Sequence, residues 1–297
     1  MATRTEEWNG LDTSIAEIEH ELAALREEST RDGLPNLRTS VLTHVAWVPP
    51  EWEEAAIDTL AGLAERHPSR AILLHPHPEA DEDALDARVS LRCFALESKA
   101  RQVCCEVIEL RLRGQRAVAP ASVVTPLAIT DLPVFLRWRG RPDFGASPFE
   151  GMVELVDRLV VDSAEWPDLP EAYTELAEIF ERTAVSDIAW ARALPWRREV
   201  AQLWPGIAEA RELRVAGPRA DALLLAGWLR SRLGREVALT HDDAAGLESV
   251  ALDGGDVPRP RGERPTASDL LSDELEQFGR DHVYEAAVRA AGSERAP

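Results

Sequence analysis

Apolar residues near the start of the chain recur at helical spacing. They stand three or four positions apart, at Leu11, Ile15, Ile18, Leu22 and Leu25. This spacing places them on one face of a helix over residues 11–28, with Glu and Arg on the opposite face. We therefore expect an amphipathic N-terminal helix that covers a domain or pairs with a partner helix.

The pattern then changes to alternating strands and helices. Residues 40–48 are apolar and β-branched, as in a strand, a helix over 50–65 follows, and residues 71–75 form a second apolar run. The order strand, helix, strand predicts parallel pairing with a right-handed crossover. Prolines at 76 and 78 are expected to end the second strand, because proline lacks the amide proton of a sheet ladder.

The remaining strands and helices of this half are also predicted from apolar runs and from the positions of proline and glycine. Strands are expected over 86–96 and 102–112, a loop followed by a strand over 125–140, a helix from Pro148 to about Asp157, and a strand at 158–161. Because the carboxyl ends of strands face the crevice of an open α/β sheet, residues 137–139 are expected to line a pocket or an interface.

The second half repeats the alternation in a shorter form. A helix over 170–183 and the segment 186–204 come first, and residues 212–216, 220–233 and 236–239 then read as strand, helix, strand. One more strand at 249–252, a proline- and arginine-rich linker at 257–265 and a closing helix at 268–290 complete the chain. Gly227 inside the helix 220–233 predicts a close helix contact, because glycine is costly in a helix.

These patterns predict an α/β protein. It has two α/β domains with mostly parallel sheets flanked by helices, plus N- and C-terminal helices. The expected parts are an N-terminal helical arm at 1–36, an N-terminal α/β domain at 37–165, and a C-terminal α/β domain with its closing helix at 166–297.

Residues 186–204, SDIAWARALPWRREVAQLW, combine three tryptophans with three arginines. Ser186 or Asp187 can cap the first turn of a helix, and Pro195 is expected to kink that helix or to open a second one. Apolar residues at 196, 200, 203 and 204 then share one helical face. The tryptophans belong either to a core or to a protein-binding face, since Trp and Arg are enriched at interface hot spots.

Charge narrows the possible partners. The 297 residues carry a formal net charge of −20 and a single lysine, Lys99, so nearly all positive charge is arginine. An acidic surface repels phosphate backbones and anionic lipids, so we expect neither nucleic acid nor membrane as a partner. The chain has no apolar run long enough to span a membrane and no signal peptide at its start, which predicts a cytoplasmic protein.

Motifs for common catalytic chemistry are absent from the sequence. It has no GxxxxGK, GxGxxG, HExxH, CxxC or GxSxG motif, so no cofactor, no metal and no catalytic residue is predicted. His75 and His77 alternate like two ligands on one strand face, but the acids after them lack a metal-binding spacing. Cys93, Cys104 and Cys105 fit a reducing compartment and not a disulfide framework, and neighbouring Cys104 and Cys105 should point to opposite strand faces.

Several stretches together resemble one known family. They are DIAWARALPWRREVAQLW at 187–204, TPLAITDLPVFLRWRG at 125–140, DRLVVDS at 157–163, LAGWLRSRLG at 225–234 and LLSDELEQFGRDHVYEAAVRA at 270–290. In their order along the chain, these stretches resemble the glucose-6-phosphate dehydrogenase assembly protein (OpcA) family. The family pattern usually has two tryptophans before the glycine turn at Gly140, and here Arg137 stands at the first of them.

The resemblance implies a non-catalytic protein of the pentose phosphate pathway. Such a protein binds glucose-6-phosphate dehydrogenase and favours its active oligomer, as an assembly factor or allosteric activator. From residue type and family motif, the candidate partner-binding residues are Arg137, Trp138, Arg139, Trp190, Arg192, Trp196 and Arg197. The alternative is a sugar-phosphate- or nucleotide-binding α/β domain, a degenerate enzyme that holds phosphate with arginines. A third possibility is a scaffold for another dehydrogenase of the same pathway.

Overall fold

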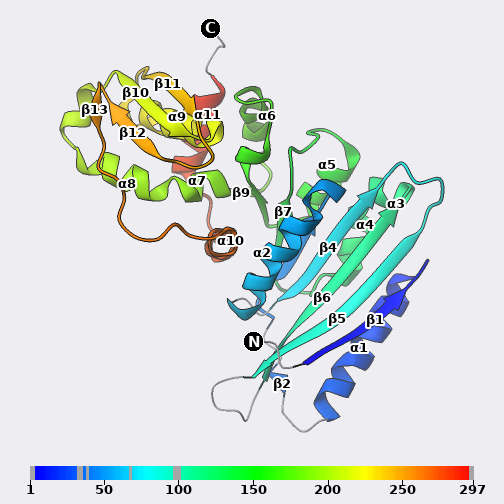
Figure 1. The fold of residues 1–297 in the computed structure, drawn as a ribbon. Coiled ribbons are helices and arrows are strands. Elements are labelled where there is room, and N and C mark those ends of the chain that lie inside the picture. Colours follow the sequence, from blue (N-terminus) through cyan, green and yellow to red (C-terminus); the bar gives the residue numbers. More distant parts are fainter. Residues whose placement is uncertain (1–3, 32–35, 38–39, 67–68, 96–101, 294–297) are drawn as a thin grey trace. The chain divides into compact units, whose positions relative to one another are not determined.

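A computed structural model describes residues 4–31, 36–37, 40–66, 69–95 and 102–293, and it has the predicted α/β class (Figure 1). The single lysine, Lys99, lies outside these residues. The chain divides into two compact units, Met1–Leu159 and Val160–Pro297. The boundaries predicted at 36 and 165 stay predictions.

The first unit contains most of the larger sheet. Its strands are β1 (Arg4–Gly10), β2 (Asn36–Leu37), β3 (Thr43–Trp47), β4 (Arg70–His77), β5 (Leu85–Ala95), β6 (Gln102–Arg113), β7 (Val134–Trp138) and β8 (Arg158–Val161), which crosses the boundary. Its helices are α1 (Ile15–Arg31), α2 (Glu53–Arg66) after a 3-10 turn η1 (Pro50–Trp52), α3 (Gln115–Val118), α4 (Pro120–Leu127) and α5 (Ser147–Leu155).

Strand order in this unit is β1-β5-β6-β4-β3-β7-β8, with β2 beside β6. β6, β4, β3 and β7 run parallel, and β3 pairs with β4 from Thr43↔Arg70 to Trp47↔Leu74, so the predicted strand–helix–strand unit is confirmed. β5 and β1 add antiparallel strands at one side. The core sheet therefore has the parallel character expected from the sequence.

The two faces of this sheet are covered by different helices. Cys104 and Glu106 of β6 lie on the face that carries Arg26 of α1, whereas Cys105 and Val107 face α2. The prediction that Cys104 and Cys105 point to opposite faces is thereby confirmed. Cys104 is disulfide-bonded, so the expectation that the cysteines stay out of disulfides is wrong at this residue.

Three local expectations in the first unit are wrong. The N-terminal arm is not only helical, because the polar run Arg4–Gly10 forms β1 against β5. The stretch before β7 is not only loop, because Pro120 opens helix α4. Pro76 does not end β4, which continues to His77. Pairing with β3 has ended at Leu74, so at Pro76 one side of β4 is an edge, where a missing amide proton costs little.

The second unit has its own small sheet. Its helices are α6 (Glu171–Ile179), α7 (Ile188–Arg192), α8 (Leu194–Gln202), α9 (Arg219–Leu233), α10 (Ala267–Leu275) and α11 (His282–Gly292), with 3-10 turns η2 (Ser163–Glu165) and η3 (Gly206–Glu209). Its strands are β9 (Ala184–Asp187), which the sequence did not predict, β10 (Glu212–Gly217), β11 (Ala238–Asp243), β12 (Ser249–Leu252) and β13 (Gly255–Asp256). The small sheet has the order β11-β10-β12-β13, and β10 pairs parallel with β11 and antiparallel with β12.

Helices α9 and α11 pack in close contact in this unit. A Cβ atom added at Gly227 would lie 2.2 Å from the carbonyl oxygen of Ala287, so only glycine allows this approach. The close helix contact predicted at Gly227 is confirmed. The closing helix, in contrast, is two helices and not one, because Asp281 caps a new helix with bonds from the amides of Val283 and Tyr284.

Candidate functional site

The arginine- and tryptophan-rich segment forms two short helices in the second unit. Asp187 accepts a hydrogen bond from the amide of Ala189 at 2.9 Å and so caps α7. Pro195 lies in the first turn of α8, where its missing amide proton is not needed. The predicted cap and the second helix opened by proline are both confirmed. The predicted apolar face is shorter than expected, because α8 ends at Gln202 and leaves Trp204 65% exposed.

Trp190 and Arg197 are held together inside this unit. The guanidinium carbon of Arg197 lies 3.1 Å from the centre of a Trp190 ring, and its Nη2 donates to the Trp190 carbonyl oxygen at 3.0 Å. The indole Nε1 of Trp190 donates to Asp281 at 2.9 Å. Burial lowers the pKa of Arg197 to about 9, so the guanidinium stays mostly protonated at neutral pH. The pair joins α7 and α8 to the start of α11.

Arg192 is the centre of an ion-pair cluster. Its Nε and Nη2 donate to the two carboxylate oxygens of Asp221 at 3.1 and 3.0 Å, and Nη2 also lies 3.4 Å from Asp162. The Asp221 side chain has no exposed surface, whereas that of Arg192 is 28% exposed. Burial opposes the charge of Arg192, but its hydrogen bonds to Asp221 and the negative charge of Asp162 outweigh this effect and raise the Arg192 pKa.

A second buried carboxylate, Asp187, accepts its hydrogen bonds from uncharged donors among the described residues. It accepts bonds from the amides of Ser163 and Ala189 and from the Tyr284 hydroxyl at 3.2 Å. Burial, together with the charge of Asp162, raises the Asp187 pKa to about 7. Asp187 is fully buried and so is not accessible to a substrate, and we assign it a structural role.

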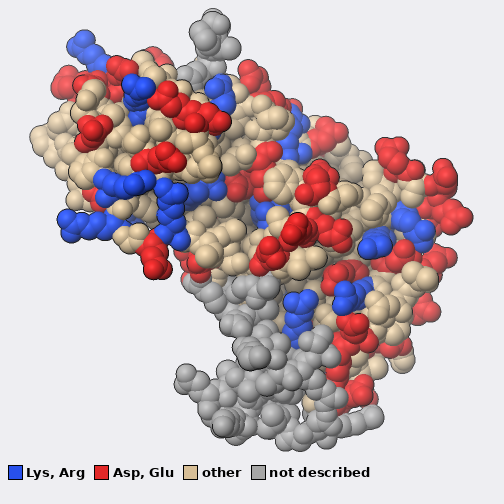
Figure 2. All heavy atoms as spheres, viewed as in Figure 1, with Lys and Arg blue, Asp and Glu red and all other residues tan. Residues whose placement is uncertain are grey.

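A hollow of about 440 Å³ opens beside α8, and the chain between β13 and α10 forms much of its lining. Arg192 and Trp196 contribute from the helices, and Arg259, Arg261 and Arg264 contribute from the loop. We call this hollow the arginine groove. Figure 2 shows Lys and Arg side chains gathering where α8 and this loop lie, although acidic side chains are widespread elsewhere on that face.

The first unit contains the other three predicted site residues, Arg137, Trp138 and Arg139, at the end of β7. Trp138 stacks on Trp47 of β3 with ring centres 4.6 Å apart, so a second tryptophan does lie beside it, although Arg137 stands at the family's usual position. Trp138 and Arg139 line a hollow of about 330 Å³ at the carboxyl ends of β3 and β7.

Arg137 and Arg139 form hydrogen bonds inside the first unit. Nη2 of Arg139 donates to Thr59 Oγ1 at 2.7 Å and to the Ala55 carbonyl oxygen at 3.2 Å, and Arg137 donates to the carbonyl oxygen of Trp138. Arg137, Trp138 and Arg139 are 3%, 5% and 8% exposed. Arg139 therefore fixes the end of β7 against α2, and Trp138 packs against Trp47 of β3.

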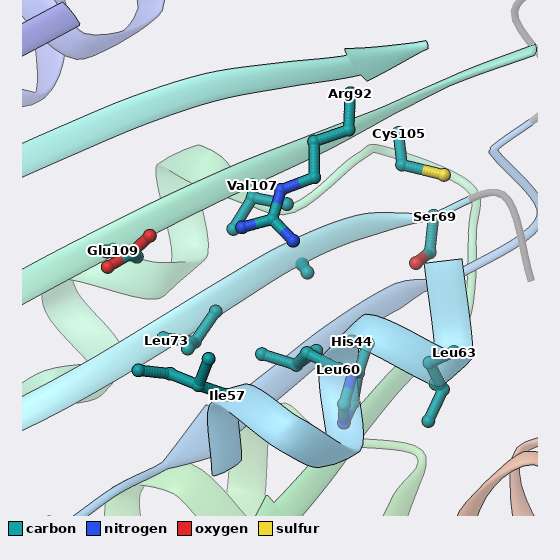
Figure 3. A pocket seen from close by; sticks show the side chains of 11 residues that line it. His44, Ile57, Leu60, Leu63, Ser69, Leu73, Arg92, Cys105, Val107 and Glu109 are labelled. Atoms are coloured by element: carbon teal, nitrogen blue, oxygen red, sulfur yellow. The ribbon is translucent and has the colours of Figure 1, made fainter. Parts of the chain in front are cut away.

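A further cavity, between the sheet of the first unit and α2, is too small for a substrate. Its volume is about 30 Å³, room for roughly one water molecule. Figure 3 shows His44, Cys105 and Glu109 around it, with Ile57, Leu60 and Leu63 of α2 along one side. Burial raises the pKa of the Cys105 thiol, which makes it unreactive. Among the described residues, no group of His, Cys, Asp and Glu side chains could hold a metal ion.

Sequence comparison identifies the family. Residues 61–178 match the model of the glucose-6-phosphate dehydrogenase subunit N-terminal domain, and residues 183–262 match the C-terminal domain of the same subunit. The chain belongs to this OpcA family. The resemblance seen in the sequence is thereby confirmed.

Two curated proteins are similar to most of this chain. The chain is 26% identical over 232 residues to a protein of Synechocystis sp., and the aligned region covers 74% of the chain and 48% of the relative. It is 27% identical over 239 residues to a protein of Nostoc punctiforme, which covers 71% of the chain and 51% of the relative. Both relatives are provisionally named OxPP cycle protein OpcA. The chain spans about half the length of these relatives.

The seven predicted partner-binding residues fall into two sets in this OpcA chain. Arg137, Trp138 and Arg139 lie together in the first unit, and Trp190, Arg192, Trp196 and Arg197 lie together in the second. Six of the seven are buried, and only Arg192 is partly exposed. Their role in partner binding stays a prediction. The arginines at 259, 261 and 264 were not among the predicted site residues, because the stretch VPRPRGERP has the composition of a linker. None of the helices in the described ranges is long and apolar enough to cross a membrane.

Proposed function

We propose that this chain is a non-catalytic protein that binds glucose-6-phosphate dehydrogenase in the cytoplasm and favours its active assembly. The observation that carries the proposal is the match to both domains of the dehydrogenase subunit family, which extends over both units. The arginine groove is compatible with it, because the described residues that line this groove include one carboxylate, Glu263, and no Ser, Cys or His.

The physical mechanism is preferential binding. A protein that binds the active assembly of the enzyme more tightly than the inactive form shifts the equilibrium by that difference in affinity, and by no more. The chain then acts on the dehydrogenase in the pentose phosphate pathway as an allosteric activator. No reacting group has to come from the chain itself.

We place one contact at the end of α8. Trp204 is 65% exposed there and Leu203 is 38% exposed, and both follow the helix that Arg197 and Trp190 hold in place. Tryptophan is among the residue types most enriched at interface hot spots, so the exposed Trp204 is a candidate contact. The predicted residues Trp190, Trp196 and Arg197 then act by positioning this end of the helix. Arg137, Trp138 and Arg139 have the same supporting role for a contact on the first unit.

The test replaces Trp204. Trp204→Ser should weaken co-elution with glucose-6-phosphate dehydrogenase from the same organism by about tenfold or more, since hot-spot truncations cost about 2 kcal/mol or more. Phe278→Ser is the matched control, because Phe278 is 71% exposed in the same unit. Unchanged binding of the Trp204 variant would mean that the contact lies on another face.

A further inference from the structure

The arginine groove concentrates positive charge on a strongly acidic chain. Arg259, Arg261 and Arg264 are exposed, and no ion pair involves them in the part of the chain that the structure describes. Arg192 at the same groove differs, because Asp221 and Asp162 balance its charge. Three arginines with uncompensated charge on a chain of net charge −20 indicate a site for an anion.

The loop that carries these arginines is fixed at both ends. Val257 is buried, and its amide donates to the carbonyl oxygen of Val250 at 2.9 Å. At the other end, Arg264 reaches the Leu247 carbonyl oxygen at 3.5 Å and lies over Gly246, where an added Cβ would be 2.9 Å from its Nη1. Prolines at 258, 260 and 265 restrict the backbone further. The arginines are therefore held around the groove, so less conformational entropy is lost when a ligand binds.

The remaining walls suit an organic ligand body. Trp196, Leu247 and Pro260 supply apolar surface, and Glu263 is the one acidic residue of the lining. The volume of about 440 Å³ is that of a small-molecule site. The guanidinium fork matches the oxygen geometry of phosphate and can bind it with two parallel hydrogen bonds.

We propose that the arginine groove binds a phosphomonoester with an organic body of sugar or nucleoside size. Arg259, Arg261 and Arg264 hold the phosphate, and Trp196 and Leu247 contact the body. This inference goes beyond the proposed function, because it concerns the chain without its partner. It also gives the second unit a way to respond to a metabolite.

The experiment is calorimetric titration of the full chain alone with glucose 6-phosphate and with adenosine 5′-monophosphate. Glucose and adenosine are the matched ligands without phosphate. We expect saturable binding of at least one phosphate ester, no binding of the parent compounds, and weaker binding as salt increases. The triple variant Arg259→Gln/Arg261→Gln/Arg264→Gln should bind that ester at least tenfold more weakly, since each charged hydrogen bond contributes about a factor of ten.

The control variant removes the same charge elsewhere in the unit. Arg211→Gln/Arg214→Gln/Arg232→Gln affects three exposed arginines that do not line the groove, and it should bind like the natural chain. No binding of either ester, or equal loss in both variants, would overturn the proposal. Loss of enzyme co-elution in the groove variant without any ester binding would also overturn it, and would assign the groove to the partner protein. Failure of the Trp204 test leaves this result unaffected, so the two proposals can fail separately.

Discussion

Arginines in two regions of this molecule illustrate opposite uses of the same side chain. At the end of β7, Arg139 is 8% exposed and forms hydrogen bonds with Thr59 and Ala55 inside the first unit. Along the loop to α10, Arg261 is exposed beside a hollow, and its charge is not paired within the described residues. The first stabilises the fold and the second is accessible to a ligand. Residue type alone does not distinguish these roles, whereas burial and hydrogen-bond partners do.

The largest effect on stability is expected at Arg192, which is partly exposed like the loop arginines and yet is hydrogen-bonded inside its unit like Arg139. Arg192→Met leaves Asp221 as a buried carboxylate without its cation, and we expect a loss of about 3–5 kcal/mol in the free energy of unfolding. Chemical denaturation of the full chain measures it. The double variant Arg192→Met/Asp221→Leu should recover most of the loss, because the fully buried carboxylate of Asp221 is then removed as well. Equal instability of the single and double variants would contradict the ion-pair account.

A pH-dependent effect comes next, at Asp187. Its pKa is raised to about 7 in the folded chain from an ordinary 3.8, so the folded state binds a proton that the unfolded state releases. The stability from this group is present at pH 4 and falls as the pH rises to 7. From pH 5 to pH 8, the free energy of unfolding of the natural chain should fall by on the order of 2 kcal/mol more than that of the Asp187→Asn variant, as measured by chemical denaturation. Parallel pH profiles of the two proteins would show that Asp187 does not titrate in this range.

A smaller loss is expected at Arg139. Arg139→Met removes the hydrogen bonds to Thr59 and Ala55 but keeps an apolar side chain of similar length, and we expect about 1–2 kcal/mol of destabilisation. The melting temperature of the full chain is the readout, with the exposed Arg116→Met as control. A shift in melting temperature no larger than that of the control would mean that Arg139, like the loop arginines, contributes little to stability.

The smallest effect on stability is expected in the groove itself. Arg259→Gln/Arg261→Gln/Arg264→Gln should change the free energy of unfolding by about 1 kcal/mol or less, because Arg259 and Arg261 are exposed without ion pairs among the described residues and Arg264 contributes one long hydrogen bond to the Leu247 carbonyl oxygen. Denaturation measured beside the binding titration tests this. A loss of several kcal/mol would show that these arginines are structural, and the contrast with Arg139 would disappear.

The sequence predicted the regular parts of the fold because periodicity reports burial. β8 at Arg158–Val161 and the helix pair around Pro195 were found from local patterns alone. β1 was missed because its polar sequence RTEEWNG becomes a strand only by pairing with β5. The break before α11 was missed because Phe278 fits an apolar helical face in sequence and yet is exposed.

The candidate site was harder to predict than the fold. The site prediction rested on tryptophan and arginine at 137–139 and 190–197. Most of these side chains are buried, and they form hydrogen bonds and ring contacts inside their own unit. No local sequence pattern reveals such contacts. The groove arginines were missed for the opposite reason. Their loop resembles a linker in sequence, and only the contacts of Val257 and Arg264 show that it is fixed against the unit.

The most direct test of the central claim is the activity of glucose-6-phosphate dehydrogenase from the same organism, measured over a range of substrate concentrations with and without this chain. We expect a dose-dependent fall in apparent KM or a rise in rate, together with a larger enzyme species on a sizing column that does not form with the Trp204→Ser variant. Unchanged kinetics and separate elution of the two natural proteins would contradict it.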